Sequence, residues 1–265
     1  MVPAYSCPVR ARTREPGIEE VEASSRDRRT LAEEVAVVLS LSLLQSAVYA
    51  LLSLFEQPVS RRVAVAVFPS LDLTRQLISI AFALAPVALV FHLIRRNDEG
   101  WEPFGLQAIR WTGDIEWGVA LAALVSAVGL AVYVVAIRLN VNRFVIPVPP
   151  LGHWWTVPVL GIGALQNALL EEVIVVGYLI RRLEQLGFTG LAALATSAVL
   201  RASYHLYQGW GGFAGNLALG VFFGWIFLRW RRTWPLVVAH TVVDTVAGVA
   251  YIAARGHCPF GVCVR

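Results

Sequence analysis

Long apolar runs recur along the chain and set its expected fold. A bilayer core about 30 Å thick requires about 20 apolar residues in a crossing helix. Seven runs approach this length, and the fifth is the shortest: residues 34–55, 76–94, 115–138, 157–180, 190–207, 212–230 and 235–254. The pattern predicts an all-α, polytopic transmembrane helical bundle of about seven spans.

Polar segments complete the expected organisation. Residues 1–30 are rich in charge and lack the apolar core and cleavage site of a secretory signal, so we expect a disordered cytoplasmic tail. Residues 31–156 then hold N-terminal transmembrane helices, residues 157–254 the candidate catalytic core, and residues 255–265 a short C-terminal tail. Residues 61–69 could form an interfacial or re-entrant segment, and an eighth span there stays an alternative.

Composition agrees with a membrane protein. The chain is 57% hydrophobic and only 15% charged, whereas about one quarter of the residues in soluble domains are charged. The net charge of +4 does not indicate nucleic acid, because the basic residues gather at the ends of apolar runs. Every basic residue is Arg, so the absence of Lys excludes a retinal or pyridoxal Schiff base.

The arginines also predict the orientation. With the N-terminus inside, about twice as many arginines lie on the cytoplasmic side as on the other, as the positive-inside rule requires. We therefore expect an integral protein of a bacterial plasma membrane, with a cytoplasmic N-terminus and an external C-terminus. On that outer side, Cys258 and Cys263 could form a disulfide or remain two free thiols.

Ionisable side chains concentrate in the last four runs. The polar residues there are Gln166, Asn167, Glu171, Glu172, Arg201, Ser203, Tyr204, His205, Asn216, His240 and Asp244. A charge at the centre of a membrane helix costs roughly 2.5–3.5 kcal/mol on insertion scales. A structural ion-pair network is the alternative, but the summed desolvation cost favours a functional site.

Spacing indicates that these groups converge. His240 and Asp244 are one helical turn apart, as are Arg201 and His205, so each pair shares a face. The two adjacent carboxylates differ by about 100° around an α-helix, so we expect only one of them to point squarely at a shared centre.

Hydrolysis is the chemistry that this set favours. A carboxylate in a dry pocket can act as a general base on water, and histidines can stabilise an oxyanion or bind a divalent metal. Ser203 is two residues from His205, a spacing that turns the two apart on a helix, so water is the expected nucleophile.

Three motifs resemble those of the CPBP intramembrane proteases, the family of the type II CAAX prenyl endopeptidases and the bacteriocin-immunity-like membrane proteins. The matching residues are Glu171-Glu172, His205 and His240-x-x-x-Asp244. The resemblance covers roughly residues 157–250. It implies a metallo- or glutamate-dependent endopeptidase that hydrolyses a membrane-associated peptide or protein within or near the lipid bilayer.

The resemblance also implies a role for each residue. Glu171 would activate the water and Glu172 would support it, while His205, His240 and Asp244 would position the water and stabilise the oxyanion. Participation of a metal stays open, with Glu171, His205 and His240 as candidate ligands of a divalent ion such as zinc.

Two positions depart from the family pattern. The Arg of the first motif is Val176 here, and the aromatic residue of the second motif is Arg201. We predict that Arg201 replaces the missing arginine from another helix, neutralises Glu172 and leaves Glu171 free to act. The departures weaken the case for a prenylated substrate, so we expect a membrane or signal-like peptide.

Two other classes of function stay open. Buried Glu, His and Asp also build the sites of proton- or ion-coupled transporters, although no inverted repeat is evident in this sequence. A non-catalytic, immunity-type family member is the third possibility, because the motif arginine is missing.

Overall fold

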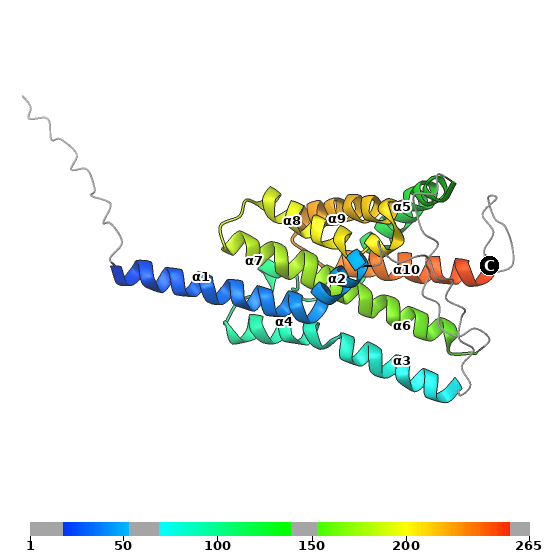
Figure 1. Cartoon of the computed structure of the whole chain (residues 1–265), viewed down its shortest axis with the longest axis horizontal. Helices are drawn as coiled ribbons and strands as arrows, with labels where there is room; N and C mark the ends of the chain where they lie inside the picture. The colour runs from blue at the N-terminus through cyan, green and yellow to red at the C-terminus, as the bar shows by residue number, and fades with distance from the viewer. Residues whose placement is uncertain (1–17, 53–68, 139–152, 255–265) are drawn as a thin grey trace, which may run out of the picture.

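The computed structural model in Figure 1 describes residues 18–52, 69–138 and 153–254. These residues form helices joined by turns, with no strand among them. Five helical segments of the described chain are long and apolar enough to cross a membrane: Ser70–Arg96, Trp111–Ala131, Thr156–Gln185, Trp210–Trp230 and Trp234–Ala253. The expected all-α, polytopic bundle is confirmed.

Two of the seven expected spans are not simple crossing helices. The first comprises α1 (Ile18–Leu39), the π-helical η1 (Ser40–Leu44) and α2 (Gln45–Leu52), and it bends by 48° between Asp27–Leu44 and Ser46–Leu52. The fifth is α8 (Gly190–Ser203), whose 14 residues fall short of the about 20 that a crossing helix requires. Residues 61–68 of the segment 61–69 and the two C-terminal cysteines lie outside the described residues.

The charged segment before the first apolar run overlaps α1, which begins at Ile18. Its charged side chains support the helix: Arg29 and Glu33, one turn apart, pair with 3.0 Å between Nε and Oε1. Such pairs stabilise a helix by about 0.2–0.5 kcal/mol each. The helix therefore extends from the apolar run into the charged segment that precedes it.

The second and fourth expected spans are also built from several elements, whereas the third, sixth and seventh are continuous helices. α3 (Pro69–Ala83) and α4 (Ala85–Arg96) are interrupted at Leu84, because Pro86 begins α4 and lacks the N–H that a continuous helix needs. The other elements are η2 (Glu102–Phe104), α5 (Trp111–Arg138), α6 (Thr156–Ala168), the π-helical η3 (Leu169–Tyr178), α7 (Leu179–Gln185), η4 (Leu206–Gln208), α9 (Trp210–Trp230) and α10 (Trp234–Ala254).

The fourth span lies at the centre of the bundle. η3 is contacted by α4, α8, α9 and α10, and residues 171–180 are all buried. In Figure 1, α6 and α7 continue η3 on either side, with α3 and α4 below and α8 and α9 above. The middle of the fourth span is therefore shielded from the surroundings of the bundle.

Paired charges gather at one end of the bundle. Arg182 Nη1 lies 2.7 Å from Glu99 Oε1, and Arg232 pairs with Asp114. These contacts join the end of α7 to the segment after α4, and the α9–α10 turn to the start of α5. Arginine-containing segments that the sequence predicts to lie on the same side of the membrane therefore lie together at one end of the bundle.

Candidate active site

Glu171 and Glu172 lie in η3, near the middle of the fourth span, with side chains 4% and 0% exposed. A π-helix closes its hydrogen bonds over five residues instead of four, so its turn is wider. Neighbouring side chains then differ by less than the roughly 100° of an α-helix. Both carboxylates reach the same partner, so the expectation that only one of them faces the site is wrong.

Arg201 is that partner. Its Nη1 lies 2.7 Å from Glu172 Oε1, and its Nη2 lies 3.1 Å from Glu171 Oε2. The side chain is buried, and the guanidinium lies 5.6 Å from the centre of the Phe223 ring. Gly220 leaves room for it, since a Cβ there would lie 3.2 Å from Arg201 Cδ. Arg201 therefore contacts both carboxylates, not Glu172 alone.

His240 and Asp244, both on α10, continue the cluster formed by Arg201, Glu171 and Glu172. These five side chains, together with His205, form the buried row. His240 Nδ1 lies 2.8 Å from Glu172 Oε1, and its Nε2 lies 3.3 Å from Asp244 Oδ2. The His240 side chain is 7% exposed and that of Asp244 is 39% exposed. The imidazole thus connects a fully buried carboxylate to one that is more open.

His205 lies beyond the end of α8, in the turn before η4, and not on a helix as the sequence suggested. Its Nδ1 lies 2.9 Å from the carbonyl oxygen of Arg201, an acceptor, so Nδ1 carries a proton. Nε2 then faces Glu171, 3.9 Å from Oε1. This turn brings the imidazole to the carboxylate.

Two polar residues outside the motifs also belong to the site. Asn167 Nδ2 lies 3.3 Å from Glu171 Oε1 and 3.4 Å from Asp244 Oδ2. Tyr204 is buried, its ring centre is 4.8 Å from that of His205, and its hydroxyl has no hydrogen-bond partner among the described residues. The signal was their spacing: Asn167 is one turn before Glu171, and Tyr204 directly precedes His205.

The site contains a donor set of the kind that binds metals. Glu171, Glu172 and His240 could hold an ion, because one ligand atom of each lies within 4.8 Å of the others. The sequence had named His205 in the place of Glu172. Arg201, however, already lies 2.7 and 3.1 Å from the two carboxylates. A divalent cation at this site would have to share the two carboxylates with the Arg201 guanidinium. These residues therefore do not fit a divalent cation and Arg201 together.

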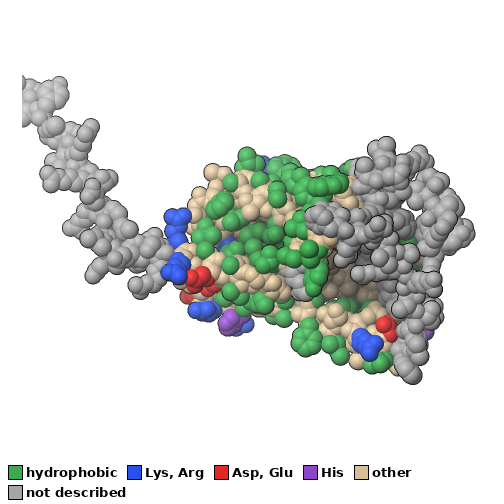
Figure 2. Space-filling model, viewed as in Figure 1, with side chains coloured by type: hydrophobic (Ala, Val, Ile, Leu, Met, Phe, Trp, Pro, Cys, Tyr) green, Lys and Arg blue, Asp and Glu red, His purple; other side chains and the backbone are tan. Residues whose placement is uncertain are grey.

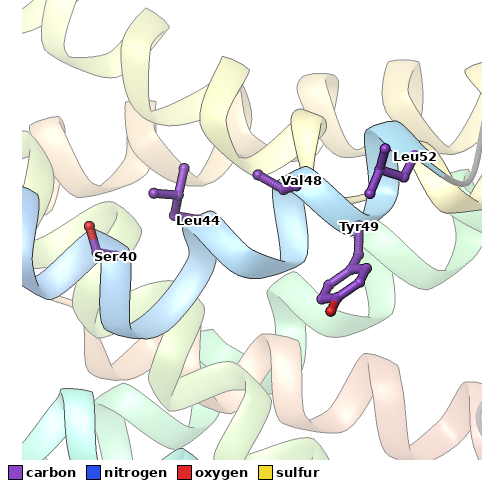
Figure 3. A pocket seen from close by; sticks show the side chains of 5 residues that line it. All are labelled: Ser40, Leu44, Val48, Tyr49 and Leu52. Carbon is purple, nitrogen blue, oxygen red and sulfur yellow. The ribbon is translucent and has the colours of Figure 1, made fainter.

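An apolar groove lies beside the bend in the first helical pair. Ser40, Leu44, Val48, Tyr49 and Leu52 line a cavity of about 430 Å³. In Figure 3 the side chains of Leu44 and Val48 point to one side of the helix and that of Tyr49 to the other. Although α2 packs against η4, which follows His205, no carboxylate, histidine or arginine lines this groove. This groove therefore adds no ionisable side chain to the buried row.

Comparison with known proteins gives a match to part of the chain. Residues 153–246 match the family model described as Rce1-like, type II CAAX prenyl endopeptidase Rce1-like. No curated protein and no solved structure matches the chain. The matched segment begins before α6 and ends within α10, so it includes every residue of the buried row.

Proposed function

We propose that the chain is a member of the CPBP family of membrane proteases, since residues 153–246 match the Rce1-like family model, and that Glu171 activates water to cut a peptide bond within or near the bilayer. The observation that carries the proposal is the convergence of all three motifs. Groups from η3, the turn after α8 and α10 meet in one buried row around Arg201. The protein is accordingly an integral membrane hydrolase.

Glu171 is the carboxylate better placed to act as the base. Glu172 is fully buried, and its Oε1 already accepts hydrogen bonds from both Arg201 and His240. A general base needs a lone pair that can reach water. Glu171 makes the longer contact with Arg201 and faces His205, whose side chain is 13% exposed. Glu172 instead holds the arginine and His240 in position.

The proposed reaction needs no group beyond these side chains and water. A water molecule beside Glu171 Oε1 and His205 Nε2 can hydrogen-bond to both atoms. Its oxygen adds to the carbonyl carbon of the peptide while Glu171 takes the proton. The tetrahedral oxyanion is stabilised by donors in the site. Glu171 then gives the proton to the leaving amine as the C–N bond breaks.

The substrate and the orientation are also proposals. The missing motif arginine at position 176 and the arginine at the aromatic position 201 distinguish this site from the family pattern. We therefore keep a membrane or signal-like peptide as the expected substrate. The end of the bundle where the Arg-rich segments meet is proposed to face the cytoplasm.

Reconstitution tests the activity and its independence of metal. Full-length protein in liposomes is expected to cleave membrane-inserted peptides, read as new termini by mass spectrometry, with a farnesylated CAAX peptide tested in parallel. EDTA is expected to leave the rate unchanged, because Arg201 supplies the positive charge. Glu33→Gln, which removes an exposed carboxylate, is the matched control. No cleavage of any peptide contradicts the proposed function. Loss of activity with EDTA and recovery with zinc contradict only the metal-free mechanism.

Tyr204→Phe separates a catalytic hydroxyl from a structural one. The Tyr204 hydroxyl is buried and has no hydrogen-bond partner among the described residues. Loss of such a group leaves stability unchanged or raises it. Loss of a donor to an oxyanion lowers kcat by about 10²–10³-fold. We expect an unchanged or higher Tm together with a lower kcat at similar KM. A lower Tm with unchanged kcat assigns the hydroxyl to structure.

A further inference from the structure

The end of α4 carries a cationic face that the catalytic site does not use. Ala88, Phe91, His92, Arg95 and Arg96 line a cavity of about 590 Å³. Their spacing of three and four residues places them on one side of the helix. Figure 2 shows basic and histidine side chains at the end of the molecule where α4 ends in Figure 1.

The two arginines of this face are available to a ligand. Both are exposed, and neither forms an ion pair within the part of the chain that the structure describes. No carboxylate lines the cavity. Glu99, three residues after Arg96, is bound to Arg182 at 2.7 Å. The residues that line the cavity therefore carry positive charge and include no acid.

The same face becomes apolar toward the middle of the span. Phe91 packs edge-on against Trp101, with ring centres 5.8 Å apart, and Ala88 lies one turn before His92. Arg95 and Arg96 end a 27-residue candidate span. The change from apolar to cationic thus falls at the boundary between acyl chains and head groups, where aromatic residues also gather.

We propose that this face binds an anionic phospholipid. Its phosphate would accept hydrogen bonds from the guanidinium groups of Arg95 and Arg96 and from His92, and an acyl chain would lie along Ala88 and Phe91. Guanidinium groups match phosphate geometry, and basic pockets beside membrane helices suit anionic head groups. A free phosphate would use the cations alone, whereas a zwitterionic lipid would leave the positive charge unbalanced.

Bound lipid has a direct route to the catalytic segment. The opposite face of α4 holds Val87, Val90, Leu93 and Ile94, all buried in the core. Through this face α4 packs against η3, which carries Glu171. A lipid that fixes the outer face of α4 therefore also stabilises its contact with η3.

Thermal unfolding of the full-length protein in detergent tests the proposal. Phosphatidylglycerol is expected to raise Tm in a saturable way, whereas phosphatidylcholine and inorganic phosphate are not. Each basic residue near an anionic surface contributes about a fivefold gain in affinity, so Arg95→Gln/Arg96→Gln is expected to weaken phosphatidylglycerol binding about 25-fold. Arg95→Lys/Arg96→Lys keeps the charge and is expected to retain most of the binding.

Arg75→Gln is the matched control, since Arg75 is exposed in the same candidate span but lies near its other end. It is expected to leave the Tm shift intact. Equal shifts with phosphatidylcholine, or an unchanged shift in the Arg95→Gln/Arg96→Gln protein, overturn the proposal. An equal shift with inorganic phosphate also overturns it, because the site would then bind a free anion. None of these outcomes depends on proteolytic activity.

Discussion

Replacing Glu171 with glutamine is expected to abolish proteolysis while the protein stays folded. Glutamine keeps the size of the side chain and can still accept a hydrogen bond from Asn167, 3.3 Å away in the native site. It cannot take a proton from water. General-base catalysis contributes about 10²–10⁴-fold, so we expect kcat to fall about a thousandfold, measured by cleavage in liposomes.

Glu172→Gln provides a comparison at the adjacent position. The chemical change is the same, but Glu172 accepts hydrogen bonds from both Arg201 and His240. We therefore expect Glu172→Gln to lower Tm more than Glu171→Gln does. His205→Ala is expected to lose activity with little loss of stability, because the side chain is partly exposed and its bond to Arg201 is to a backbone oxygen. Full activity in both Glu171→Gln and His205→Ala proteins would falsify the assignment of the site.

Much of the candidate site could be predicted because helical spacing is regular. His240 and Asp244, four residues apart, do lie together on α10. Arg201 lies in the last turn of α8, four residues before His205, and it reaches both carboxylates. An isolated buried charge is costly in a membrane protein, so such groups are expected to contact one another.

The remaining features depend on local backbone choices that spacing does not reveal. η3 winds as a π-helix, and Glu171 and Glu172 within it contact the same arginine. α8 ends at Ser203, although the sequence around it stays compatible with a helix. The charged start of α1 was interpreted as disorder because its polar composition resembles that of a tail. Each of these differences concerns where a helix ends or how tightly it winds.

Arg201→Phe is expected to be among the most damaging single substitutions in the core. It restores the aromatic residue of the family motif but leaves Glu171 and Glu172 buried without their cation. Removal of one partner from a buried ion pair costs about 3–5 kcal/mol. The Phe223 ring lies against the guanidinium in the native protein and can pack against the phenylalanine of the variant. The substitution therefore tests the loss of the charge and not the loss of side-chain volume. We expect a large fall in Tm and no proteolysis.

Adding Val176→Arg to Arg201→Phe recreates the family arrangement within this chain. Val176 is buried and lies four residues after Glu172 on the same helical segment. Alone, Val176→Arg adds a second buried cation beside Arg201 and is expected to destabilise the protein. If the arginine has moved between helices, the double variant is more stable than either single variant, a coupling that a double-mutant cycle measures directly. Simple additivity of the two losses would show that an arginine at position 176 cannot serve these carboxylates. An Arg201→Phe protein with native stability and activity would show that Arg201 is not the cation of the site.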